Sequence, residues 1–106
     1  MKDNSCVTSN GKFSYITEEG YVRNIFSIIF ALKKADVPYT DHKMFDGWQI
    51  TFPWCEGDVI CHFGSYGSDG GYVESMNFPW DEGDVSTDTP EEMAKKIIDY
   101  YKELNK

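Results

Sequence analysis

The sequence has no long apolar run. No segment approaches the roughly 20 residues needed to span a bilayer, and Met1–Ser5 lacks the apolar stretch of a secretion signal. We therefore expect a cytoplasmic protein. A hydrophobic content of 41% excludes a disordered chain, because such chains bury too little apolar surface to offset their ordering entropy. A length of 106 residues predicts a single domain, 1–106.

Cysteine is scarce and odd in number, with Cys6, Cys55 and Cys61, so complete internal disulfide pairing is excluded. Reduced thiols fit a cytoplasmic protein. No Cys-x-x-Cys pair begins a zinc site, and the glycine-rich segment 64–71 has neither the lysine nor the helix of a phosphate loop. Cys61 and His62 point to opposite faces of a strand, so we interpret Cys61 as a buried structural residue. We predict no catalytic residue, metal ligand or cofactor.

Basic residues are nearly absent from the middle of the chain. The net charge is −8, and between Asp41 and Glu92 twelve carboxylates face one base, Lys43. Such a segment repels nucleic acid and anionic lipid and attracts a basic partner surface. Direct nucleic-acid binding through it is excluded, because Lys and Arg supply most of the affinity for phosphates.

One helix is predicted in each terminal part of the chain. Thr17 with two following glutamates begins the first, and Pro38 prevents its continuation beyond Ala35. Its apolar residues lie at helical spacing, in a stripe made of Val22, Ile25, Phe26, Ile29 and Phe30 and widened by Tyr21, Ile28 and Leu32. The width indicates either a helix enclosed by a sheet and a second helix or a helix that packs on a second subunit.

The second helix has the clearest start signal. Thr89 is the expected N-cap, Pro90 occupies the first turn and Glu92 completes a capping box. The apolar stripe that follows consists of Met93, Ile97, Ile98, Tyr101 and Leu104.

Four strands are predicted between the helices, at 39–45, 48–52, 59–63 and 72–78. Asp46-Gly47 is a two-residue turn signal, and Gly57 is available for positive φ. The expected fold is a two-layer α+β domain, in which both helices pack on one face of a four-stranded antiparallel meander. We expect residues 1–12 to be flexible or to form a short hairpin.

An eight-residue phrase occurs twice. Residues 52–59, Phe-Pro-Trp-Cys-Glu-Gly-Asp-Val, return at 78–85 with a single difference, Cys55 for Asp81. The second and fourth strands of a meander run in the same direction, so both copies leave the sheet at the same edge. Alternate strands lie about 10 Å apart, and the copies are therefore expected to form neighbouring loops.

The phrase has three readings. Its aromatic residues close the end of the core, or Trp54 and Trp80 anchor a partner inside an acidic rim, or its carboxylates hold a divalent cation. The second reading predicts a partner-binding set of tryptophans and acids: Trp54, Glu56, Asp58, Asp69, Glu74, Trp80, Asp81, Glu82 and Asp84.

Size and charge favour a small acidic, non-enzymatic protein that engages a larger partner with a basic surface. In its sharpest form the hypothesis is a DNA mimic that inhibits a nucleic-acid-binding enzyme, by analogy of class alone. Two alternatives stay open, a cation-dependent module or small enzyme that uses the loop carboxylates, and a structural homodimer. The protein is expected as a monomer or a homodimer.

Overall fold

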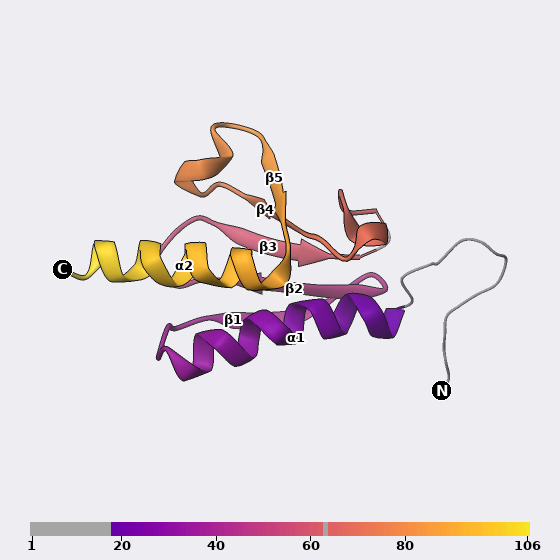
Figure 1. The fold of residues 1–106 in the computed structure, drawn as a ribbon, viewed down its shortest axis with the longest axis horizontal. Coiled ribbons are helices and arrows are strands. Elements are labelled where there is room, and N and C mark those ends of the chain that lie inside the picture. The colour runs from indigo at the N-terminus through magenta and orange to yellow at the C-terminus, as the bar shows by residue number, and fades with distance from the viewer. Residues whose placement is uncertain (1–17, 63) are drawn as a thin grey trace, which may run out of the picture.

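The computed structural model describes residues 18–62 and 64–106 (Figure 1). The flexible segment or hairpin expected for residues 1–12 lies outside these residues. The elements are two α-helices, five strands and two short 3-10 helices, in the order α1 (Glu18–Lys34), β1 (Thr40–Met44), β2 (Gly47–Thr51), β3 (Asp58–Cys61), η2 (Ser68–Gly70), β4 (Val73–Met76), η3 (Pro79–Asp81), β5 (Val85–Asp88) and α2 (Pro90–Leu104).

The predicted α+β class is confirmed, but the sheet has five strands rather than four. The strands form an antiparallel meander in the spatial order β1-β2-β3-β4-β5. The fourth strand ends at Met76, and β5 pairs with it, placing Val85 opposite Met76 and Asp88 opposite Val73. Prediction missed β5 because it contains one apolar residue in four, too few for an alternating pattern.

Both helices cover the same face of the sheet. Pairing places Ile50 opposite Val59, and these two side chains are fully buried. They belong to one core together with apolar residues of both helices. α1 contacts β2 and β3, α2 contacts β5, and the two helices pack against each other (Figure 1).

The orientation of α1 differs from the expected one. Ile28 and Leu32, which seemed to widen the stripe, are fully buried, whereas Phe26 and Phe30 are 46% and 65% exposed. Ile25 and Ile29 are buried as predicted. The sheet and α2 thus cover the side of α1 that carries the branched aliphatic residues. Phe30 is largely exposed, and Phe26 is partly exposed beside Trp48 of β2, with the two ring centroids 5.5 Å apart.

The N-cap and the first-turn proline of α2 follow the sequence signal. The Thr89 hydroxyl accepts a hydrogen bond from the Glu92 backbone N–H at 3.2 Å, which satisfies one of the unpaired donors of the first turn. Met93, Ala94 and Ile97 are buried against the sheet and α1.

The turn between β1 and β2 lies one residue earlier than predicted. Met44 pairs with Gly47, so the turn residues are Phe45 and Asp46, with Phe45 at φ 55°. Gly47 belongs to the strand. A Cβ there would lie 1.8 Å from the Cys61 carbonyl oxygen, so glycine is required for the close approach of β3 rather than for turn geometry.

No helix within the described residues is both long enough and apolar enough to cross a membrane.

Candidate functional site

The two copies of the repeated phrase form the β2–β3 and β4–β5 connections, and both leave the sheet at the same edge, as predicted. The ring centroids of Phe52 and Phe78, the first residue of each copy, lie 5.8 Å apart in a T-shaped arrangement. The two connections are therefore in direct contact through these rings.

Each copy folds its tryptophan back toward its own phenylalanine. Trp80 stacks on Phe78 with centroids 4.5 Å apart and an interplanar angle of 6°, and Trp54 lies 5.2 Å from Phe52. The last turns of α2 close the arrangement, because Trp54 and Trp80 both contact Tyr100 and Trp54 also contacts Tyr101. We call this group the aromatic cluster: Phe52, Trp54, Phe78, Trp80, Tyr100 and Tyr101.

Both indoles are half-buried and hydrogen bonded within the chain. Trp54 Nε1 donates to the Pro38 carbonyl at 2.8 Å, and Trp80 Nε1 donates to Ser75 Oγ at 3.1 Å. A buried indole N–H normally finds such a partner. These bonds hold the tryptophans against the body of the protein, so the part of each ring that remains exposed is rigidly positioned.

Asp81, the residue that distinguishes the copies, is a buried carboxylate. It is 4% exposed, with Oδ1 accepting from Ser75 Oγ at 2.8 Å and Oδ2 from the Phe78 backbone N–H at 3.1 Å. It therefore fixes the β4–β5 connection onto β4. Its counterpart Cys55 is half-buried, and burial is the main cause of the raised pKa of this thiol, opposed by a backbone hydrogen bond from Gly57 and reinforced by the charge of Glu56.

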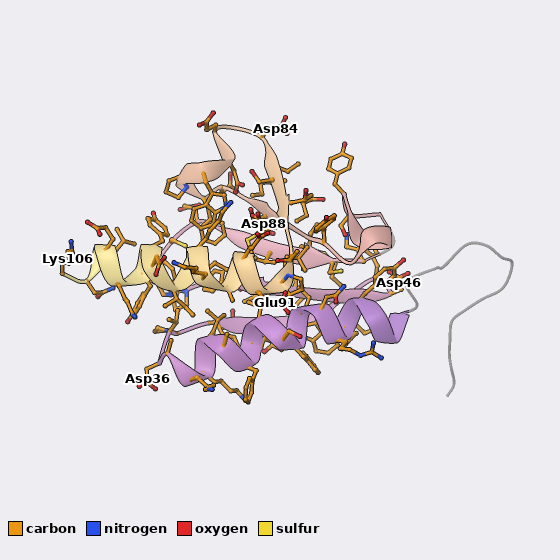
Figure 2. The ribbon with its side chains drawn as sticks, in the orientation of Figure 1. Asp36, Asp46, Asp84, Asp88, Glu91 and Lys106 are labelled. Carbon is orange, nitrogen blue, oxygen red and sulfur yellow. The ribbon has the colours of Figure 1, made fainter. Side chains whose placement is uncertain are left out.

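The remaining acids of the two copies reach solvent. Glu56, Glu82 and Asp84 are exposed, and Asp58 is half-buried at the start of β3. Figure 2 shows Asp84 at the outer end of the β4–β5 connection, where it meets β5. These four residues are called the acidic loop surface below.

Asp58, in this surface, has a carboxyl group whose pKa is raised above its ordinary value. Desolvation is the largest cause of its raised pKa, the hydrogen bond from Gln49 Nε2 at 2.8 Å opposes the rise, and the negative charge of Asp81 adds to it. The charge of Asp81 in the second copy thus acts on Asp58 in the first.

Two of the nine expected site residues lie elsewhere. Asp69 belongs to η2, in the β3–β4 connection, which leaves the sheet at the opposite edge. Glu74 is 7% exposed in β4 and accepts a hydrogen bond from the Tyr66 backbone N–H at 2.8 Å. Its carboxylate therefore holds the β3–β4 connection in place.

Lys96 of α2 is a neighbour of the site that sequence reasoning missed. Its Nζ lies 2.9 Å from Asp88 Oδ2 and 5.6 Å from the centre of the Trp80 ring. Tyr100 and the Pro38 carbonyl were missed as well. No local pattern marks these groups, because each comes from an element distant in sequence from the tryptophan it contacts.

The described residues offer little for nucleophilic or metal chemistry. Within residues 18–62 and 64–106, no group of three or more His, Cys, Asp or Glu side chains is placed to hold a metal ion. Cys61 is fully buried, as predicted. Burial raises the pKa of its thiol to about 11, against a smaller opposing effect of the Asn24 amide, so the thiol stays protonated at neutral pH.

No protein-family model, curated protein or solved structure matches this chain.

Proposed function

We propose that this protein is a small acidic binding protein without enzymatic activity, which engages a basic surface of a larger protein through the acidic loop surface. In the sharper form of the proposal it acts as a DNA mimic, with carboxylates in the place of phosphates, and inhibits a nucleic-acid-binding enzyme. The observation that carries the proposal is the contact between the two copies, which brings Glu56, Asp58, Glu82 and Asp84 to one edge of the sheet.

The local charge supports a basic partner. Residues 52–58 and 77–84 contain five carboxylates and no Lys, Arg or His. Lys96, whose ammonium group lies over the Trp80 ring of the second copy, pairs with Asp88 rather than with a loop acid. A concentration of one sign of charge raises the rate of encounter with an oppositely charged surface and repels wrong partners.

The aromatic cluster supports a rigid docking edge. Its indoles are locked by the Pro38 and Ser75 hydrogen bonds, so their exposed parts need no further ordering when a partner binds. Pre-organised side chains lose less entropy on association, and half-buried tryptophans beside a charged rim resemble the usual anatomy of a binding surface.

The test compares two variants with the same change in net charge. Glu56→Gln, Glu82→Gln and Asp84→Asn together neutralise the exposed acids of the surface. The matched control neutralises three exposed acids elsewhere, Asp36→Asn, Glu91→Gln and Glu103→Gln. An oligo-arginine peptide serves as the basic probe, and tryptophan fluorescence reports on binding, because two of the three tryptophans flank the surface.

We expect the loop variant to weaken binding by at least about tenfold at low salt, and the control variant by much less. The affinity of the natural protein should fall steeply as NaCl rises from about 50 to about 300 mM, since exposed charges are then screened within a shorter distance. Equal losses in the two variants would show that net charge alone attracts the probe and would overturn the proposed surface.

The inhibitor form of the proposal has its own test. A host protein that is captured by the natural chain and not by the loop variant should be displaced by duplex DNA. Simultaneous binding of DNA and this protein to that partner would overturn the DNA-mimic version and leave the simpler binding function standing.

A further inference from the structure

β5 is the last strand of the sheet and has β4 on its inner side (Figure 1). Within the described residues no strand lies on its outer side. An edge strand presents unpaired N–H and C=O groups, to which a further strand can be added. The pairing across the sheet shows which groups of β5 these are.

The direction of the backbone groups can be followed from the β1–β2 hairpin. Met44 and Gly47 close a two-residue turn, so Gly47 directs its N–H and C=O groups toward β1. Because this direction alternates along a strand, Ile50 directs its groups toward β3. There it forms a hydrogen-bonded pair with Val59.

The same alternation continues across β3 and β4. Ile60, the next residue of β3, directs its groups toward β4 and pairs with Glu74. Ser75 therefore directs its groups the other way, toward β5, where it pairs with Ser86. The residues on either side of Ser86 thus direct their N–H and C=O groups outward.

These outward residues are Val85 and Thr87. Within the described residues their N–H and C=O groups have no hydrogen-bond partner. Thr87 is exposed and Val85 is half-buried. The free edge therefore offers two donors and two acceptors in the spacing of an antiparallel ladder.

Acidic side chains lie at both ends of β5. Asp88, at one end, lies on the helix-covered face, because its Oδ2 is 2.9 Å from Nζ of Lys96 in α2. Asp84 immediately precedes the strand (Figure 2), and both Asp84 and Glu82 are exposed. Since Lys96 offsets the charge of Asp88, the excess negative charge lies at the Asp84 end.

The opposite face of β5 is less polar. Val85 pairs with Met76 of β4, so the two side chains lie together on the face away from the helices. Met76 is 40% exposed, and Thr87 shares this face with Val85. A strand added at the edge would cover part of this apolar surface.

We propose that β5 binds an extended segment of the partner as an additional antiparallel strand, and that this segment alternates basic and apolar residues. The apolar residues lie opposite Val85 and Thr87 and hydrogen bond to them through their backbone groups. A basic residue lies opposite Asp84. This inference rests on the proposed function for the basic character of the partner and adds the form in which the partner binds.

Charge disfavours a second copy of this chain as the added strand. Two β5 strands that joined their free groups would pair Val85 of each copy with Thr87 of the other, about a two-fold axis at Ser86. Asp84 of each copy would then lie opposite Asp88 of the other. Directly opposed like charges destabilise a sheet, whereas a basic segment places the complementary charge there.

The first test uses a synthetic peptide of alternating lysine and valine with blocked ends. One version carries N-methyl groups on valine amides, and a second carries an equal number on lysine amides, so the charge is the same. We expect methylation of the valine amides to weaken binding at least about tenfold and methylation of the lysine amides to have little effect, because the valine amides face β5. Tryptophan fluorescence measures the affinities.

Amide hydrogen exchange, followed by NMR, tests the edge directly. In the free protein the Val85 and Thr87 amides should exchange rapidly. A saturating concentration of the unmethylated peptide should slow them at least about tenfold. The amides of Ser86 and Asp88 face β4 and should be protected in both states.

A substitution in β5 gives a third readout. Proline is tolerated in an edge strand where the N–H faces outward, so Thr87→Pro removes one free donor and keeps the ladder with β4. We expect it to weaken peptide binding at least about fivefold, and Thr87→Val, which keeps the N–H, to leave binding unchanged. Circular dichroism checks the folding of both variants, and the two preceding tests use the natural chain.

Failure of this inference is distinguishable from failure of the proposed function. Equal binding of the two methylated peptides, or unchanged exchange at Val85 and Thr87, would overturn the added strand and leave an electrostatic contact with the acidic loop surface standing. If valine methylation weakened binding while the loop variant Glu56→Gln, Glu82→Gln and Asp84→Asn bound normally, the added strand would stand and the acidic loop surface would be wrong.

Discussion

Gly57 and Gly83 occupy the same position of the repeated phrase and have different physical reasons to be glycine. A Cβ on Gly57 would lie 2.5 to 2.6 Å from three ring carbons of Phe78, whereas a Cβ on Gly83 would have nothing within 4 Å. Gly83 instead has φ 85°, a conformation that is costly for residues with a side chain. The positive φ expected at Gly57 is therefore wrong: this residue is glycine because a ring lies against it.

Alanine at the two positions should separate these causes. Gly57→Ala is expected to lower the free energy of unfolding by about 1–3 kcal/mol, because Phe78 is held by its ring contacts and cannot move aside. Gly83→Ala should cost about 1 kcal/mol through backbone strain alone. Urea unfolding followed by tryptophan fluorescence measures both.

Measuring both alanine substitutions again in a Phe78→Leu protein distinguishes the two causes. In it, the cost of Gly57→Ala should shrink, because the smaller side chain relieves the clash, and the cost of Gly83→Ala should not change. Strictly additive effects at Gly57 would contradict the assignment of its role to the Phe78 ring.

At the scale of elements, the sequence predicted both helices and three strands from their apolar patterns or caps, and it located β1, which has no such pattern, from the Asp46-Gly47 turn signal that follows it. β5 carried no such pattern. The repeated phrase could have predicted β5. In the first copy Asp58-Val59 begins β3, and Asp84-Val85 occupies the matching position in the second copy. The turn at Phe45-Asp46 was not predicted because Gly47 suggested a turn at its own position. Gly47 is instead required by its close contact with Cys61 of β3, 14 residues further along the chain.

The candidate site was predictable in position and not in detail. Strand direction alone placed the two copies at one edge, which the Phe52–Phe78 contact confirms. The environment of each acid could not be predicted from the sequence. Asp81 and Glu82 are adjacent carboxylates, yet it is Asp81 that accepts hydrogen bonds from the Ser75 hydroxyl and the Phe78 backbone N–H. Burial of that kind depends on tertiary contacts that no local pattern encodes.

Lys96 offers a prediction about how α2 is fastened to the sheet. Its ammonium group contacts both Asp88 of β5 and the Trp80 ring, whereas the adjacent Lys95 forms an exposed pair with Asp99 one turn along the same helix. Lys96→Ala should therefore lower the free energy of unfolding by about 1 kcal/mol, and Lys95→Ala by clearly less. Both substitutions change helix propensity equally, so urea unfolding compares them directly.

Lys96→Met separates charge from packing in the same experiment. It keeps most of the apolar stem and should retain part of the lost stability, since long charged side chains also cover apolar surface. Equal effects of Lys96→Ala and Lys95→Ala would show that the contact with Trp80 and Asp88 contributes nothing measurable.

At the scale of the whole molecule, the excess of acids opposes folding. The net charge is −8, and the labelled acids in Figure 2 are spread over several parts of the structure rather than confined to one face. Bringing like charges together in a compact state costs free energy. The ion pairs at Lys95–Asp99, Lys96–Asp88 and Lys106–Glu103 act in the opposite direction, but most are exposed and individually weak.

The thermal midpoint should therefore rise with salt. Repulsion between exposed charges reaches about 30 Å at 0.01 M ionic strength and about 10 Å at 0.1 M, so we expect an increase of a few degrees over that range of NaCl, at a fixed protein concentration because association also shifts the midpoint. Glu82→Gln with Asp84→Asn should raise the midpoint at low salt and reduce the increment, because it removes two of the interacting charges. A midpoint that fell with salt would mean that the ion pairs outweigh the repulsion. The charge of acids such as Glu82 and Asp84 would then already be neutralised within the chain, and these carboxylates would be poor candidates for binding a basic partner.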